Sequence, residues 1–106
     1  MEITAKENTG VLTVRLLGEL DHHGAARARQ EIDAIIEETA PRKVVLDLGD
    51  VYFCDSSGLG LIMGRYKKAR SLGAELVIGE ASGAVERIMA LAGLGAIIKI
   101  EGGTTA

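Results

Sequence analysis

The chain has 106 residues, of which 47% are hydrophobic and 25% charged, and its formal net charge is −3. This length and composition predict one globular domain with its own core. The negative charge, without any run of basic residues, argues against nucleic acid as a partner. The single cysteine, Cys54, allows no disulfide within the chain and belongs to no metal-binding spacing, so we expect a reducing, cytoplasmic setting. No segment reads as a signal peptide or is apolar for long enough to span a bilayer, so we expect no membrane partner.

The N-terminal part of the chain predicts a β-hairpin followed by a helix. Residues 2–7 and 11–17 have the composition of strands, and Asn8-Thr9-Gly10 between them is typical of a turn. A helix is expected over residues 24–39, because apolar residues recur there at helical spacing. Asp21 can cap this helix, because its carboxylate can accept from backbone N–H groups that have no helical partner.

The rest of the chain alternates between strands and helices, each inferred from apolar periodicity and from the turn and capping residues at its ends. In chain order we expect a strand at 44–48, a loop at 49–54, a helix capped by Asp55 or Ser56 and ending near Leu72, a strand at 75–78, a helix capped by Ser82 and closed by Gly93, and a last strand at 96–100.

This alternation predicts an α/β fold. We expect a single domain over residues 1–101, with a mixed, mainly parallel sheet of about five strands, an N-terminal hairpin, and helices packed on the sheet. Residues 102–106 are expected to form a short flexible tail.

The helix after Cys54 has two distinct faces at a period of 3.6 residues. Its expected core-facing stripe is Leu59, Ile62, Met63 and Tyr66, and its expected outward face is Ser56, Gly60, Gly64 and Lys67. A glycine inside a helix costs about 1 kcal/mol relative to alanine, so two on one face require a reason. Two explanations remain open: a bare strip on which another protein docks beside Ser56, or relief of crowding against a neighbouring loop.

A catalytic or ligand-binding role for the serines, histidines or glycines of this chain has weaker support. Ser56 or Ser57 as a nucleophile lacks the Gly-x-Ser-x-Gly context of a nucleophile elbow. His22-His23 has no partner at metal-ligand spacing. The glycines around Gly60 do not have the spacing of a dinucleotide fingerprint and lie inside the helix. We therefore expect no enzyme activity, no metal and no cofactor.

A serine at a helix N-terminus beside a docking strip is well placed for a phosphorylation switch. A phosphate adds roughly −1.5 to −2 charges and three acceptor oxygens. The helix N-terminus tolerates this charge, whereas a closely apposed partner would not.

Three motifs carry a resemblance to a known family: Gly18-Glu19-Leu20-Asp21-His22-His23, Asp55-Ser56-Ser57-Gly58-Leu59-Gly60 and Gly64-Arg65-Tyr66-Lys67. Together they resemble the anti-sigma factor antagonists of the STAS fold and, among these, the sporulation group of anti-anti-sigma factors typified by SpoIIAA. The resemblance extends over almost the whole chain. The chain departs from the family in lacking the further C-terminal helix that relatives usually carry, and in having Cys54 where they have a methionine.

The resemblance implies a partner-switching module. Ser56 would be phosphorylated by an anti-sigma factor serine kinase similar to SpoIIAB and restored by a phosphatase similar to SpoIIE. The unphosphorylated form would bind the kinase and release a sporulation sigma factor. Together with the expected docking strip, this predicts the partner-binding residues Asp21, Asp55, Ser57, Gly58, Gly60, Leu61, Gly64 and Lys67.

Two other functions stay open. One is a STAS module of another partner-switching pathway, such as the general stress response, with a different kinase. The other is a nucleotide-binding or nucleotide-hydrolysing protein that uses Ser56 or the histidines. Turnover that disappears in Ser56→Ala would indicate the second.

Overall fold

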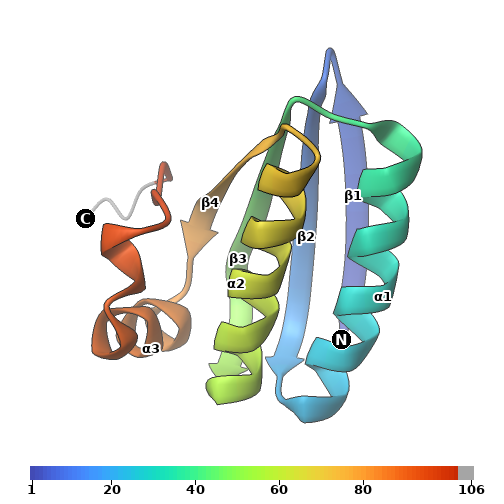
Figure 1. The fold of residues 1–106 in the computed structure, drawn as a ribbon. Coiled ribbons are helices and arrows are strands. Elements are labelled where there is room, and N and C mark those ends of the chain that lie inside the picture. The colour runs from blue at the N-terminus through green and yellow to red at the C-terminus, as the bar shows by residue number, and fades with distance from the viewer. Residues whose placement is uncertain (103–106) are drawn as a thin grey trace.

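Four strands form one mixed sheet in the order β1-β2-β3-β4 (Figure 1). They are β1 (Glu2–Asn8), β2 (Val11–Leu20), β3 (Lys43–Cys54) and β4 (Glu75–Ala81). The first pair is antiparallel, and the other two pairs are parallel. This computed structural model describes residues 1–102, so most of the predicted tail at 102–106 lies outside the described residues. The expected hairpin and mainly parallel sheet are confirmed.

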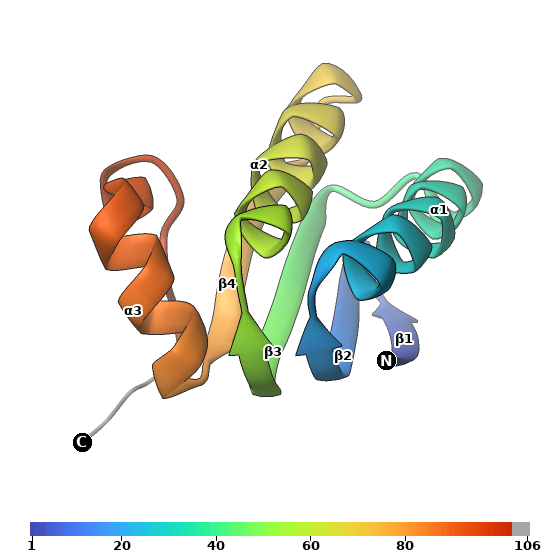
Figure 2. The same cartoon turned by 90° about the horizontal axis from the view of Figure 1, so that it is seen from below.

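Within residues 1–102, three α-helices pack around this sheet: α1 (His22–Thr39), α2 (Ser56–Ser71) and α3 (Gly83–Ala92). α1 and α2 lie side by side on one face, whereas α3 lies beside the β4 edge (Figure 2). The expected caps Asp21, Asp55 and Ser82 each accept a hydrogen bond from a backbone N–H of the first turn. In the described part of the chain, no helix combines the length and the apolar character needed to cross a bilayer.

The core fills the space between the sheet and the helices. Its fully buried side chains alternate along the strands and recur at helical spacing on the helices, as the sequence periodicity predicts. They include Leu12, Val14, Leu16 and Leu20 of β2; Val44, Leu46, Leu48 and Val51 of β3; and Ala28, Ile32 and Ile36 of α1. This packing holds the starts of α1 and α2 at one end of the sheet.

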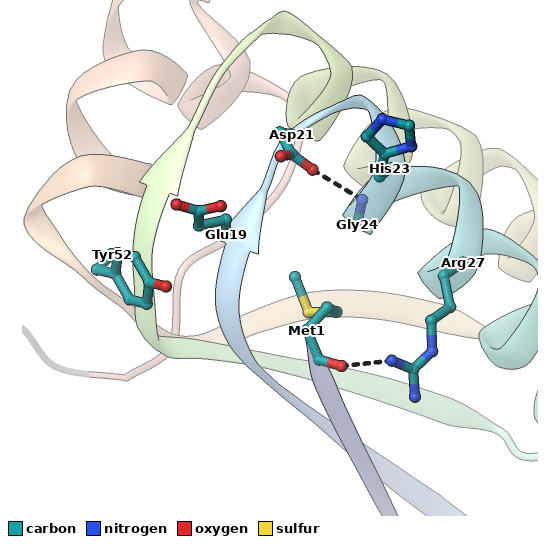
Figure 3. Close-up of a pocket in the computed structure, with 7 residues that line it drawn as sticks. All are labelled: Met1, Glu19, Asp21, His23, Gly24, Arg27 and Tyr52. Atoms are coloured by element: carbon teal, nitrogen blue, oxygen red, sulfur yellow. Dashed lines mark hydrogen bonds between the residues drawn. The ribbon is translucent and has the colours of Figure 1, made fainter.

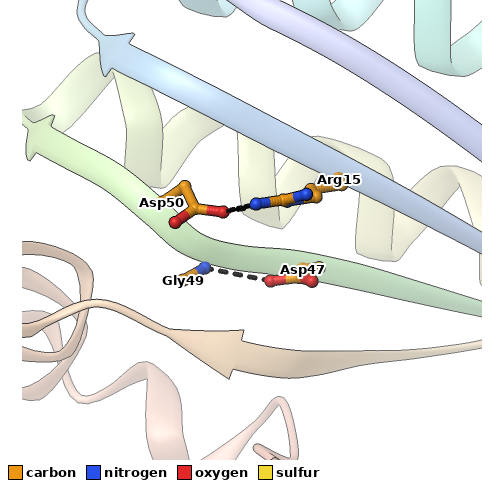
Figure 4. A network of polar contacts seen from close by, with 4 residues as sticks. All are labelled: Arg15, Asp47, Gly49 and Asp50. Atoms are coloured by element: carbon orange, nitrogen blue, oxygen red, sulfur yellow. Dashed lines mark hydrogen bonds and ion pairs between the residues drawn. The ribbon is translucent and has the colours of Figure 1, made fainter.

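The loop expected at 49–54 is instead a continuation of β3. Arg15 of β2 pairs with Asp47, but Leu17 pairs with Asp50, so β3 carries one extra residue at this point. Such a bulge interrupts the alternation of buried and exposed residues that marks a strand. It also brings Asp50 to Arg15, with which it forms an ion pair, while Asp47 accepts from the Gly49 N–H (Figure 4). The interrupted alternation explains why the strand was predicted to end early.

The last strand expected at 96–100 is also not formed. The chain makes a short 3-10 helix, η1 (Leu94–Ala96), and only Ile100 pairs with the sheet, through a single parallel bridge to Ile78. Leu94 and Ile98 are buried, and the Ile98 N–H donates to the Leu94 carbonyl oxygen. The apolar residues of this segment therefore anchor a turn, and the sheet has four strands where about five were predicted.

The core-facing stripe of α2 is rotated from the predicted one. Its buried residues are Gly58, Leu61, Ile62, Arg65 and Ala69. Leu59, Met63 and Tyr66, expected in the stripe together with Ile62, are only partly buried and pack at the margin of the core. The rotation follows from the neighbours of α2: it contacts α1 along one flank, and a charged side chain of α2 is buried there.

Candidate functional site

The starts of α1 and α2 are held next to each other by two neighbouring parallel strands. Leu20, the last residue of β2, pairs in register with Cys54, the last residue of β3. Asp21 and Asp55 follow directly and cap the two helices. The Asp21 Oδ1 accepts from the Gly24 N–H at 2.8 Å, and the Asp55 Oδ1 accepts from the Ser57 N–H at 2.8 Å. Both predicted interface aspartates therefore lie at the same edge of the sheet.

The same four-residue pattern, Asp-x-x-Gly, forms both helix starts. A Cβ atom added at Gly24 would lie 2.3 Å from the Glu19 carbonyl oxygen, and one added at Gly58 would lie 2.4 Å from the Cys54 Sγ. Contacts this short do not occur, so both positions require glycine for close packing of helix on strand. Gly58, predicted as a partner contact, thus serves the junction inside the molecule. The recurrence of Asp-x-x-Gly is the sequence signal that points to this paired junction.

Ser56 is the first residue of α2 and is exposed, whereas Ser57 behind it is half-buried. The Asp55 carboxylate bonds to the Ser57 N–H, which leaves the Ser56 hydroxyl free of the cap. A negatively charged group on Ser56 would stand at the positive end of the helix dipole. Ser56 is therefore exposed at a helix end whose dipole favours negative charge.

The outward glycines of α2 lie on open surface. A Cβ added at Gly60 or Gly64 would meet no atom within 4 Å among the described residues. Crowding against a loop within residues 1–102 therefore does not explain them. Lys67, predicted on the same side, is exposed. Gly60 and Gly64, in the strip formed by Ser56, Gly60, Gly64 and Lys67, are thus not covered by other described residues.

A groove of about 460 Å³ runs between α1 and α2 beside this strip. Its lining residues are His22, Ala25, Ala26 and Arg29 from α1 and Ser57, Gly60, Leu61, Gly64 and Arg65 from α2. Leu61 was predicted to bind a partner, but it is only 4% exposed, and its side chain packs in the core beneath the groove. Leu61 therefore contributes to the groove only by packing beneath it.

The buried ion pair below this groove was not anticipated from the sequence. Arg65 of α2 lies with its Nε 2.8 Å from the Oδ1 of Asp33 on α1, and the exposed fractions of the two side chains are 8% and 23%. Burial lowers the pKa of the Arg65 guanidinium, while the Asp33 charge opposes that shift. The sequence did carry one signal of this burial. Arg65 lies at helical spacing from Leu61, Ile62 and Ala69, which places it on the same face of α2 as these buried residues.

A second cavity of about 310 Å³ opens on the other side of Asp21, lined by Met1, Glu19, Asp21, His23, Gly24, Arg27 and Tyr52 (Figure 3). His23 is one of the residues that line this cavity, whereas His22 lines the groove between α1 and α2, so the adjacent histidines border different spaces. The Gly24 N–H lowers the pKa of the Asp21 carboxyl below its ordinary value. Asp21 is therefore charged at neutral pH.

Cys54 is the last residue of β3 and is partly buried. Burial raises the pKa of its thiol to about 11, with a smaller contribution from the Asp55 charge. The thiol is therefore protonated at neutral pH and is a poor nucleophile. Cys54 acts as a small packing residue against Gly58, because its Sγ lies 2.4 Å from the position that a Cβ atom on Gly58 would take.

Comparisons with known proteins agree with this geometry. A family model described as STAS domain matches residues 2–104. The anti-sigma F factor antagonist of Paenibacillus polymyxa is 39% identical over 100 residues, covering 94% of this chain and 86% of the relative. The anti-sigma-B factor antagonist of Bacillus subtilis (strain 168) is 30% identical over 101 residues, covering 95% and 91%. The solved structure of the anti-sigma factor antagonist SpoIIAA in its unphosphorylated form is similar at a TM-score of 0.78 and 26% identity, covering 93% and 87%.

Proposed function

Because this chain belongs to the STAS domain family, we propose that it is an anti-sigma factor antagonist controlled by phosphorylation of Ser56. Its unphosphorylated form binds an anti-sigma factor that is also a serine kinase, similar to SpoIIAB, and a sporulation sigma factor is released. The kinase phosphorylates Ser56, which ends the binding, and a phosphatase similar to SpoIIE restores it.

One observation carries this proposal: the exposed hydroxyl of Ser56 stands at the end of a bare strip that includes Gly60 and Gly64. Glycines without covering atoms let a partner approach the helix backbone closely. A phosphate placed at the end of that contact adds bulk and roughly −1.5 to −2 charges. A loss of about 3 kcal/mol of binding free energy lowers affinity more than a hundredfold.

The proposed footprint of the partner follows from exposure. It comprises Asp21, Asp55, Ser56, Ser57, Gly60, Gly64 and Lys67 around the two helix starts and along the strip. Gly58 and Leu61 belong to it only indirectly, because Gly58 permits close packing and Leu61 fills the core below the groove.

A phosphorylation assay tests the proposal. The chain is incubated with ATP and the anti-sigma F factor of Paenibacillus polymyxa, whose antagonist is 39% identical to this chain. The expected result is the mass increase of one phosphate, located on the peptide that contains Ser56 and absent in Ser56→Ala. Phosphate located on another residue, or an unmodified chain that also fails to bind the kinase, would contradict the proposal.

A second candidate is the same module in a stress-response pathway, favoured by the 30% identical anti-sigma-B factor antagonist of Bacillus subtilis. The same assay with an anti-sigma-B factor kinase separates the two. The pathway is the one whose kinase modifies Ser56 faster at equal concentrations.

A further inference from the structure

The strand β1 forms one margin of the sheet, and its outer edge is open (Figure 1). Among the described strands, β1 pairs with β2 alone. Only Ile3 of this strand is half-buried and the other residues are exposed, so the neighbouring helix α1 does not cover the edge. An uncovered edge strand offers unpaired N–H and C=O groups to another strand.

The register of the hairpin determines which backbone groups of β1 point outward. Asn8 and Val11 close a two-residue turn and pair directly. In such a hairpin the closing pair is hydrogen-bonded, and so is every second pair along the strands. Counting back from Asn8, the even-numbered residues of β1 therefore bond to β2. The N–H and C=O groups of the odd-numbered residues Ile3, Ala5 and Glu7 point away from the sheet.

The side chains of β1 are self-complementary about Thr4. Glu2 and Lys6 stand two residues to either side of it, on the same face of the strand. Within residues 1–102, neither takes part in an ion pair. If two copies of β1 run antiparallel with Thr4 opposite Thr4, Glu2 of each copy faces Lys6 of the other. Opposite charges that face each other across an antiparallel pair stabilise it.

We propose that β1 is a self-association surface, on which a second copy of this chain pairs antiparallel about Thr4 and joins the two sheets into one. Other registers that oppose the outward backbone groups lack this match. Centring the pair on Ala5 places Lys6 opposite Thr4, and centring it on Lys6 places two lysines together. A lysine on an edge strand ordinarily discourages pairing, but here it selects the one register in which it meets a glutamate.

The opposite face of the strand and the position of β1 in the sheet agree with this arrangement. On the face toward the helices, Ile3 of one copy lies beside Ala5 of the other, which removes two partly exposed apolar side chains from water. α2 packs on β3 and β4, so pairing at β1 leaves Ser56 accessible. Self-association at β1 is therefore independent of the proposed function.

Charge reversal tests the register. Sedimentation velocity from about 10 µM to about 1 mM is expected to show a reversible, weak dimer of the unaltered chain, as is usual for a small interface. Lys6→Glu opposes two glutamates at both ends of the contact and is expected to raise the dimer Kd about tenfold or more. The double variant Glu2→Lys with Lys6→Glu restores both pairs and is expected to return to within about threefold of the unaltered chain.

Lys67→Glu makes the same change of charge at an exposed position on α2 and is the matched control, with no expected effect on the dimer. A chain that stays monomeric over the whole concentration range would overturn the inference. So would a double variant that associates as weakly as Lys6→Glu, or a Lys67→Glu variant that loses as much affinity as Lys6→Glu.

Amide hydrogen exchange tests the edge without any variant. The N–H groups of Ile3 and Ala5 are expected to exchange quickly in dilute solution and about tenfold more slowly at high concentration, because bonds between copies protect them. Thr4 and Lys6 are internal controls, since their bonds to β2 protect them already in dilute solution. Equal exchange of Ile3 and Ala5 at both concentrations would overturn the inference. Both tests use this chain alone, so a failure to bind the kinase would count against the proposed function only.

Discussion

Gly58 and Gly60 lie two residues apart on α2 and have opposite surroundings. A Cβ atom at Gly58 would stand 2.4 Å from the Cys54 Sγ and 3.1 Å from Leu20 side-chain atoms, whereas one at Gly60 would meet nothing within 4 Å. Gly58 is therefore required by packing inside the domain. Gly60 is not required by packing against the described residues, although glycine weakens the helix, which supports the proposed contact with a partner.

Alanine at these two positions is expected to change stability in opposite directions. Gly60→Ala stabilises the fold by about 0.5–1 kcal/mol, because alanine has the higher helix propensity. Gly58→Ala destabilises it by about 1–3 kcal/mol, because helix and strand must move apart. Urea unfolding monitored by circular dichroism measures both. Changes of the same sign would contradict the difference in packing.

Gly64→Arg is expected to weaken kinase binding at least tenfold without lowering the melting temperature. The new side chain has free space on this chain but would occupy the partner's approach. Gly83→Arg is the matched control, because Gly83 also has no atom near an added Cβ but starts α3. A large drop in melting temperature for Gly64→Arg would mean that Gly64 is packed inside.

Ser56→Ala is expected to bind the kinase as well as the unaltered chain does and to resist phosphorylation, because it removes the acceptor without adding bulk. Ser56→Asp is expected to bind more weakly, because it adds charge beside Asp55. Ser71→Asp, at the exposed far end of α2, controls for an added carboxylate. Calorimetric titration with the kinase measures all three. If Ser56→Ala lost binding as much as Ser56→Asp, charge would not be the switch.

Breaking the ion pair between Arg65 and Asp33 is expected to cost more than removing it whole. Arg65→Met leaves the Asp33 carboxylate largely buried without its partner, at a cost of about 3 kcal/mol. The double variant Arg65→Met with Asp33→Leu removes both charges and is expected to lie within about 1 kcal/mol of the unaltered chain. Denaturant unfolding of the unaltered chain, Arg65→Met, Asp33→Leu and the double variant checks this. If the double variant lost as much stability as the two single variants together, the expectation would be contradicted.

The Asp21 cap predicts part of the response to acid. The Gly24 N–H lowers the pKa of Asp21 in the folded state from its ordinary value of 3.8. The carboxylate thus contributes stability that is fully present above that value and is lost as pH falls through the folded pKa. Asp21→Asn keeps a capping oxygen but cannot titrate. Its unfolding free energy is expected to fall less steeply below about pH 4 than that of the unaltered chain. If the unfolding free energies of the two chains changed with pH in parallel, Asp21 would not contribute to the response to acid.

Most helices and strands were predictable because their signals are local. The Asn8-Thr9-Gly10 turn and the capping residues Asp21, Asp55 and Ser82 act within a few residues of their own positions. The two faces of α2 were only partly predictable, since periodicity does not reveal which helices flank the element. The bulge after Asp47 and the turn at Leu94 depend on pairing with distant strands, and both segments were assigned wrongly.

By itself, the sequence determined the α/β class, the helix starts and a serine ahead of two outward glycines, because capping and periodicity depend on neighbouring residues. Only the tertiary structure decided that Leu20 and Cys54 align and so bring Asp21 beside Asp55. It also decided that Gly58 is buried while Gly60 is open, and that Arg65 meets Asp33 below the groove. The strand alignment joins residues 34 positions apart in the sequence, and the ion pair joins residues 32 positions apart. They exist only once the parallel strands and the two helices have packed together.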